Sequence, residues 1–201
     1  MIKGICFDLD GVFFTPQSFQ NFKKNLPKQI EDENKINHVL YKSFEMLDFK
    51  KGKISEADFW SYAIKELGIQ TDTNGIFDIL KSSYEINDGV RDYVIKVRNA
   101  GYKTYICSNN FETRIRELDN KFDFLSLFDV HVFSYEVGYM KPAKEIFETL
   151  VKKSGVRPEE IVYSDDDETK MQGAKELGIN TFLYTDFDSF VKHLEVLGVK
   201  V

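Results

Sequence analysis

Two clusters of acidic residues are spaced in a way that could support metal-assisted chemistry. Asp8 and Asp10 lie in the run FDLDGV, after a short apolar segment, and Asp165 and Asp166 lie in the run YSDDDE, after another. The alternation of side chains along a strand places Asp8 and Asp10 on the same side of the backbone. The first run is equally typical of a structural turn after a strand, because Asp and Gly are common turn residues.

Convergence of these carboxylates would require a counter-ion. A cluster of Asp8, Asp10, Asp165 and Asp166 could not persist unpaired without protonation or a bound cation. Carboxylate oxygens that leave room for water and a substrate phosphate favour Mg²⁺. Asp167 has a simpler interpretation, because a helix N-terminus stabilises an acid.

Two further positions could bind a phosphate. Ser108, Asn109 and Asn110 follow a second apolar segment and offer a hydroxyl and two amides, although the same residues are typical of a helix N-cap. Lys141 precedes Pro142 at the expected start of a helix, where an ammonium opposes the helix dipole. A phosphate or the carboxylate of Asp8 would supply the missing partner, and an ordinary surface lysine is the alternative.

The elements that must position these residues form an alternating pattern. The apolar character of the strand segments is nearly continuous, which indicates burial on both faces of a sheet. Apolar residues recur at helical spacing in the segments 90–97, 143–150 and 187–194. These segments lie before, between and after the later strands. The sequence therefore predicts an α/β fold, a parallel sheet with crossover helices, whose strands lie at residues 5–8, 104–107, 130–133, 161–163 and 181–184.

The segment between the first strand and Asp88 is too long for a normal crossover. About seventy residues there show helical patterns and no convincing strand, which predicts an inserted helical cap. Ser55 and Gly68 are expected to begin and end one helix, with Trp60 in the core of the cap. We interpret the Lys50-Lys51 pair as solvated surface. Candidates to face the site are Phe13, Phe14, Phe44 and Asp48, although packing is the simpler role for the aromatic ones.

Composition limits the possible partners. The 201 residues include 27 Lys and Arg against 33 Asp and Glu, so the net charge of -6 offers no basic field for nucleic acid or an anionic membrane. No apolar run is long enough for a membrane span, and Lys3, Asp8 and Asp10 interrupt the N-terminal segment. We therefore expect a cytoplasmic protein. Cys6 and Cys107 lie within strand-like segments and are expected to be buried, with no disulfide or metal.

Taken together, the motifs resemble those of the haloacid dehalogenase-like (HAD) superfamily. The runs DLDGV (8–12), SNN (108–110), KP (141–142) and SDDD (164–167) occur in the order that this family uses, at successive strand ends. The resemblance covers essentially the whole chain and is closest to small phosphatases with a helical cap after the first strand. It implies a three-layer Rossmann-like core domain formed by residues 1–14 and 88–201, with a cap domain at 15–87.

The resemblance also implies catalytic roles. Asp8 would attack phosphorus, become an aspartyl-phosphate and ligate the metal through its carboxylate. Asp10 would protonate the leaving oxygen, later deprotonate the hydrolytic water, and bind the metal through its backbone carbonyl. Ser108, Asn109 and Lys141 would bind the phosphate. The Mg²⁺ ligands implied in this way are Asp8, Asp10, Asp165 and Asp166.

The expected activity is Mg²⁺-dependent hydrolysis of a small phosphate ester. The phosphatase branch that the chain resembles suggests a sugar phosphate as the substrate. We expect a monomer or homodimer that binds neither nucleic acid nor membrane. Two alternatives stay open: a phosphotransferase similar to β-phosphoglucomutase, and a non-catalytic HAD-like binding protein. The mutase branch typically has a histidine where this chain has Gln20, and Asp10 argues against a dehalogenase. Thr15 and Lys170 depart from the family pattern, which puts the support of the metal in doubt.

Overall fold

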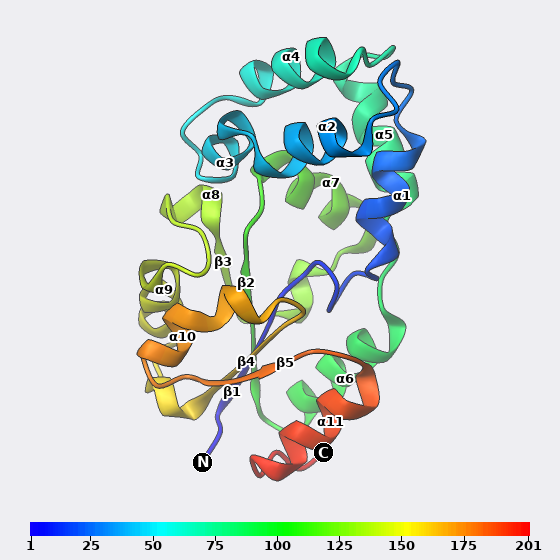
Figure 1. Ribbon diagram of the computed structural model, residues 1–201. Helices are drawn as coiled ribbons and strands as arrows, with labels where there is room; N and C mark the ends of the chain where they lie inside the picture. The colour runs from blue at the N-terminus through cyan, green and yellow to red at the C-terminus, as the bar shows by residue number, and fades with distance from the viewer.

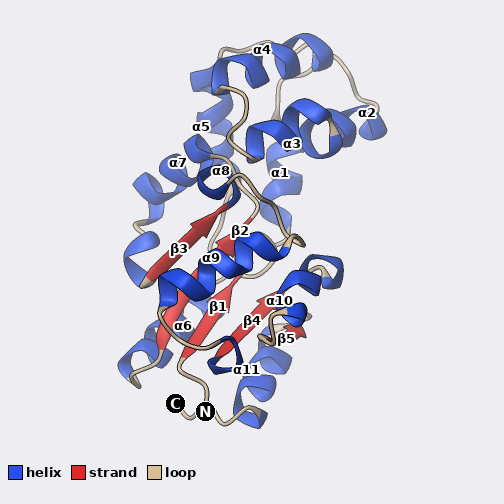
Figure 2. Ribbon diagram, turned by 90° about the vertical axis from the view of Figure 1, so that its left-hand side faces the viewer, coloured by secondary structure: helices blue, strands red, loops and turns tan.

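Five strands form one parallel sheet in the order β3-β2-β1-β4-β5 in the computed structural model, which describes residues 1–201 (Figures 1 and 2). The predicted fold class is confirmed, and the predicted strand ends differ from those observed by two residues or fewer. Because β1 lies between β2 and β4, three of the motifs meet at one edge of the sheet. The strands are β1 (Gly4–Phe7), β2 (Lys103–Ser108), β3 (Val130–Phe133), β4 (Ile161–Asp165) and β5 (Asn180–Leu183).

Helices cover both faces of the sheet, which explains the continuous apolar character of its strands. On one face Ile5 and Phe7 pack with α6 and α11, and on the other Cys6 packs with α9 and α10. Both cysteines are buried and free, as expected. The helices that follow the strands are α6 (Asp88–Asn99), α7 (Glu112–Phe122), α8 (Ser134–Val137), α9 (Lys144–Ser154), α10 (Gln172–Glu176) and α11 (Phe187–Val196), with 3₁₀ turns at Leu125–Leu127, Pro158–Glu160 and Glu168–Met171.

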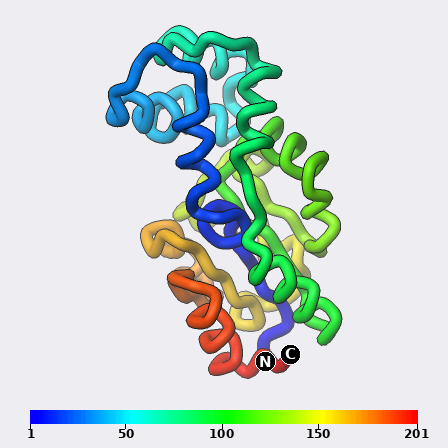
Figure 3. The backbone as a smooth tube through the Cα atoms, turned by 90° about the vertical axis from the view of Figure 1, so that its right-hand side faces the viewer, coloured from blue at the N-terminus to red at the C-terminus, as the bar shows by residue number.

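A second group of helices lies at one end of the molecule, beyond the carboxyl ends of the strands (Figures 1 and 3). We call residues 17–83 the helical region. The segments that connect it to the sheet run side by side, because the Thr15 N–H donates to the Glu85 carbonyl at 3.0 Å. Its elements are α1 (Gln17–Asn25), α2 (Glu33–Asn37), a π-helical turn (His38–Lys42), α3 (Phe44–Lys50), α4 (Glu56–Leu67) and α5 (Thr73–Ser83).

An aromatic cluster joins the helical region to the rest of the protein. Phe49 stacks on Phe111, which precedes α7, with ring centroids 4.6 Å apart. Trp60 is 1% exposed and packs edge-on against Phe59 and Phe77, so its predicted role in packing is confirmed. Ser55 caps α4 by accepting from the Asp58 N–H. None of the helices in the protein has both the length and the apolar character that a membrane span requires.

Asn87 occupies the N-cap position of α6. The start of α9 differs from expectation. α9 begins at Lys144, after Pro142, because the segment before it forms a turn closed by the Ala143 N–H and the Met140 carbonyl at 2.9 Å.

Substitution of Trp60 tests this packing. Trp60→Ala should lower the free energy of unfolding by about 3–5 kcal/mol, because it empties a buried aromatic position. Urea denaturation provides the measurement. Tyr139→Ala, at a side chain that is half exposed, is the control and should change the stability by less than about 1 kcal/mol. Equal losses in the two variants would contradict this account of the cluster.

Candidate active site

The turn after β1 brings two acidic residues to the edge of the sheet. Asp8 follows the last strand residue and is only 2% exposed. Gly11 has φ +78°, and a Cβ at this position would overlap the carboxylate of Asp166, which follows β4. The glycine therefore permits both the turn and the close approach of two loops.

Three of the four acids considered as a cluster in the sequence converge, and the carboxylate of Asp10 does not join them. Oxygens of Asp8, Asp165 and Asp166 lie within 4.8 Å of one another. Burial raises the pKa of Asp8, and burial together with the charges of Asp8 and Asp165 raises the pKa of Asp166 to about 6. These shifts report the cost of crowding negative charges, and a bound cation would remove that cost. The donor set is all oxygen, so it fits a hard divalent ion such as Mg²⁺.

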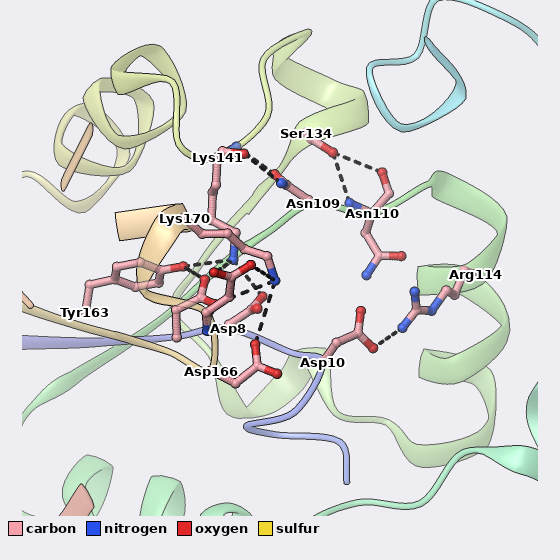
Figure 4. Close-up of polar contacts among 12 residues, drawn as sticks. Asp8, Asp10, Asn109, Asn110, Arg114, Ser134, Lys141, Tyr163, Asp166 and Lys170 are labelled. Atoms are coloured by element: carbon pink, nitrogen blue, oxygen red, sulfur yellow. Dashed lines mark hydrogen bonds and ion pairs between the residues drawn. The ribbon is translucent and has the colours of Figure 1, made fainter. Parts of the chain in front are cut away.

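Lys141 provides the main counter-charge. Its ammonium lies 2.9 Å from Asp8 Oδ1 and 2.7 Å from Asp165 Oδ2, and the residue is 4% exposed (Figure 4). Burial alone would lower the pKa of Lys141, but the carboxylates outweigh burial and raise it. Tyr163, which the sequence analysis missed, accepts from Lys141 Nζ at 2.8 Å and donates to Asp165. Burial opposes ionisation of Asp165, yet Lys141 and Lys170 lower its pKa to about 2.

Lys170 adds a second cation to the cluster. Its Nζ lies 3.7 Å from Asp165 Oδ1 and 3.7 Å from Asp166 Oδ1, and its side chain is 19% exposed. The lysine therefore contacts two of the three carboxylates that could hold a metal. Asp167 caps the following turn by accepting from the Thr169 N–H at 3.0 Å, in keeping with its simpler interpretation.

The residues after β2 divide into distinct roles. Ser108 lines the cavity next to Asp8. Asn109 also lines it, but its amide is bound to the backbone of Lys141: Asn109 Nδ2 donates to the Lys141 carbonyl at 3.0 Å, and the Lys141 N–H donates to Asn109 Oδ1 at 2.7 Å. Asn109 therefore positions the lysine. Asn110 is fully buried, and its Nδ2 has no hydrogen-bond partner in the protein.

Asp10 faces a different partner from Asp8. Its carboxylate pairs with the guanidinium of Arg114 on α7 and accepts from the Tyr84 hydroxyl at 3.5 Å (Figure 4). The Arg114 side chain is 3% exposed, whereas that of Asp10 is 34% exposed. The carboxylate of Asp10 thus lies outside the cluster of three and keeps access to the cavity.

The cavity lies between the edge of the sheet and the helical region. Its volume is about 210 Å³, and its lining includes Asp8, Asp10 and Lys141 from one side and Tyr41 and Lys50 from the other. A neighbouring cavity of about 430 Å³ shares Asp10 and Tyr41 with it and extends toward α1. A third cavity, of about 560 Å³, belongs to the helical region alone and contains none of the motif residues.

None of the four candidates to face the site lines either cavity near the acids. Phe13 and Phe14 are fully buried in the core, so packing, the simpler role given to them, is the one they have. Phe44 is 86% exposed and has neither role. Asp48 pairs with Lys53 at 3.8 Å.

Lys50 is a further correction, because it is 7% exposed and lines the cavity rather than forming solvated surface. Docking of α3 on the sheet edge buries it, and no local pattern in the sequence signals such docking.

This arrangement can hold an anion and a divalent cation together. Lys141, Lys170 and Lys50 line a cavity that also contains the buried carboxylate of Asp8, and the partly exposed carboxylate of Asp10 lies beside them. A nucleophilic carboxylate next to a bound phosphate and an acid–base group is sufficient for covalent phosphoryl transfer.

Comparisons with known proteins agree with this chemistry. A family model described as haloacid dehalogenase-like hydrolase matches residues 2–178. A D-ribitol-5-phosphate phosphatase from Bacteroides thetaiotaomicron is 26% identical over 90% of this chain and 91% of its own length. A HAD-family enzyme from the same organism, solved with magnesium and inorganic phosphate, is 26% identical with a TM-score of 0.75 over 92% of this chain and 95% of that one. A structure of a HAD-like hydrolase from Porphyromonas gingivalis is 25% identical with a TM-score of 0.77 and covers 100% of both chains.

The pair of Asp10 and Arg114 generates a stability prediction. Asp10→Asn leaves a buried guanidinium without its carboxylate and should lower the free energy of unfolding by about 3 kcal/mol. Arg114→Met should cost less, because the partly exposed Asp10 can be hydrated. In urea denaturation, the double variant should lose at least about 1 kcal/mol less than the sum of the single losses. Additive losses would show that the pair contributes no coupling energy.

Proposed function

The chain belongs to the haloacid dehalogenase-like hydrolases, and on that premise we propose that it is a Mg²⁺-dependent phosphatase that hydrolyses a small phosphorylated metabolite through an aspartyl-phosphate on Asp8. The observation that carries this proposal is the buried ion pair between Asp8 and Lys141 inside a cluster of carboxylates. A structural role alone does not explain such crowding of acids at the edge of a cavity. The phosphatase and the magnesium–phosphate complex among the similar proteins support the same choice.

In the first step Asp8 acts as the nucleophile. A carboxylate oxygen of Asp8 forms a bond to phosphorus while the bond between phosphorus and the ester oxygen breaks. The ester oxygen keeps the electron pair and takes a proton from Asp10. Arg114 and Tyr84 contact the carboxylate of Asp10 and fix its position beside the cavity that Asp10 lines.

In the second step water attacks the aspartyl-phosphate. Asp10 accepts a proton from this water as the new bond to phosphorus forms, and the bond to Asp8 breaks to release inorganic phosphate. Splitting the hydrolysis in this way replaces one difficult displacement by two easier ones. The same residue serves as acid and then as base, which requires access to both the leaving group and water. Its partly exposed position provides that access.

Binding of the phosphate depends on charge and hydrogen bonding. Lys141 pairs with Asp8 and lines the cavity, and Ser108 adds a hydroxyl to the lining. The Asn109 side chain fixes the backbone of Lys141 at this position. Preorganised donors of this kind stabilise charge that develops on the phosphoryl oxygens in the transition state.

The residues that would hold Mg²⁺ are Asp8, Asp165 and Asp166, with the backbone carbonyl of Asp10. When bound, the ion would neutralise charge on the phosphoryl oxygens and reduce their repulsion of the attacking carboxylate. Asp165 is held by Lys141 and Tyr163, so its orientation is set before a metal binds.

The nucleophile is tested by Asp8→Asn. This variant should lower kcat for phosphate release by at least about 1000-fold, because the amide cannot form the acyl phosphate. The assay compares p-nitrophenyl phosphate with a panel of sugar and nucleotide monophosphates, in Mg²⁺ or EDTA. Asp188→Asn, an exposed acid in α11, is the control and should retain wild-type turnover. Substantial turnover by folded Asp8→Asn protein would refute the mechanism.

Lys170 provides a test that does not depend on turnover. Lys170→Asn removes a positive charge next to two candidate metal ligands and should tighten Mg²⁺ binding by at least roughly tenfold. Isothermal titration calorimetry without substrate measures this affinity. Lys175→Asn, whose lysine pairs with Glu168 at the surface, is the matched control and should leave the affinity unchanged. Unchanged or weaker binding by Lys170→Asn would place the ion away from Asp165 and Asp166.

A further inference from the structure

Lys50 stands apart from the other cations of the cavity because it has no acidic partner. Lys141, Lys170 and Arg114 each have a carboxylate within 3.7 Å. The ammonium of Lys50 forms no ion pair of this kind and lies 4.6 Å from the centroid of the Tyr41 ring. The residue is 7% exposed and lines the 210 Å³ cavity together with Asp8 and Asp10. A lysine buried to this extent is normally paired.

The backbone of Lys50 is tied to the residues that follow β2. The Ser134 hydroxyl donates to the Lys50 carbonyl at 2.6 Å, and the Asn110 N–H donates to Ser134 Oγ at 2.9 Å. All three residues are buried. Asn110 adjoins the proposed phosphate-binding residues, so these bonds fix the backbone of Lys50 relative to the phosphate site. Because the backbone is fixed and the residue is buried, its side chain loses less entropy on binding an anion than an exposed lysine would.

Lys50 lines the same cavity as the proposed nucleophile, Asp8, and the proposed proton donor, Asp10. Burial and the charge of Arg114 lower the pKa of Lys50 to about 8. The ammonium is therefore charged at neutral pH and attracts an anion within this cavity.

Lys141 and Lys50 line one cavity of about 210 Å³, which is small for a ligand pocket. Two anionic groups that bind these lysines therefore lie close together. The rest of a substrate could extend into the neighbouring cavity of about 430 Å³, which shares Asp10 and Tyr41.

We propose that Lys50 binds a second anionic group on the substrate, a carboxylate or a second phosphate that lies a few bonds from the ester oxygen. This inference rests on the proposed phosphatase function and names its substrate class: short phosphorylated acids or bisphosphates. Lys50 is a specificity-determining residue in this scheme. It contacts the part of the substrate that does not react, and it makes the placement of the ester depend on a second charge.

The experiment compares substrates that differ only in the second anion. One pair is 3-phosphoglycerate and glycerol 3-phosphate, and the other is propane-1,3-diol bisphosphate and propyl phosphate. In the wild-type protein, kcat/KM should be at least roughly tenfold higher for the doubly anionic member of one pair or of both. The pair that shows the preference identifies the second anion as carboxylate or phosphate.

Substitution assigns the preference to one residue. Lys50→Met keeps most of the side-chain volume and removes the charge, so it should reduce that ratio to within about threefold of unity. Lys51→Met, at the next position along the chain, is the matched control and should leave the ratio as in the wild type. A wild-type ratio near unity in both pairs overturns the inference, as does a preference that persists in Lys50→Met. An equal loss for both members of a pair also overturns it, because Lys50 would then act on the transferred phosphate.

Failure of the proposed function gives a different result. If the wild type hydrolyses none of the four esters, the same pairs are titrated calorimetrically into wild-type and Lys50→Met protein. Tighter binding of the doubly anionic esters that disappears in Lys50→Met supports the anion site while the phosphatase assignment fails. Equal binding of both members of each pair overturns the inference.

Discussion

The site depends on one ammonium held between two buried carboxylates. The parallel sheet brings the ends of β1 and β4 together, and this places Asp8 against Asp165 in a region from which water is excluded. Lys141 offsets their repulsion, and its backbone is held by Asn109, which follows β2. Gly173 on α10 allows close packing against the next residue, because a Cβ there would overlap the carbonyl of Pro142. Four segments distant in sequence thus meet at Lys141 and Pro142.

Charge divides the cavity into two halves with different chemistry. On one side Asp8, Asp165 and Asp166 form a cluster that suits a divalent ion, with Lys170 close by. On the other side Asp10 is paired with Arg114 and is free of that cluster. Lys141 favours the ionised form of Asp8, which the proposed nucleophile requires. Asp10 has a different environment, because its side chain is 34% exposed and lines the cavity from the other side.

The sequence predicted those features that follow from strand order and short motifs. Continuous apolar segments located all five strands, and the acids after β1 and β4 were expected to converge. Arg114 gave no comparable signal, because α7 is rich in charged residues and only its docking against Asp10 buries the guanidinium. Lys50 was misinterpreted for the same reason, since its burial depends on contact between α3 and the sheet edge. Tertiary docking, rather than local pattern, determined both positions.

The connections at Thr15 and Glu85 lie next to each other, so the helical region has the form of an insertion whose two ends are close in space. Since its two ends leave and return at neighbouring points, its internal length does not strain the strands that carry the acids. Replacement of this region by the corresponding region of a relative would therefore leave the acids at the sheet edge in place and change the lining of the cavity. Such a replacement is constrained, because it must supply an aromatic ring that stacks on Phe111 and a carbonyl that accepts from the Ser134 hydroxyl. These two contacts are the structural requirements that an inserted helical region must meet to pack against this sheet.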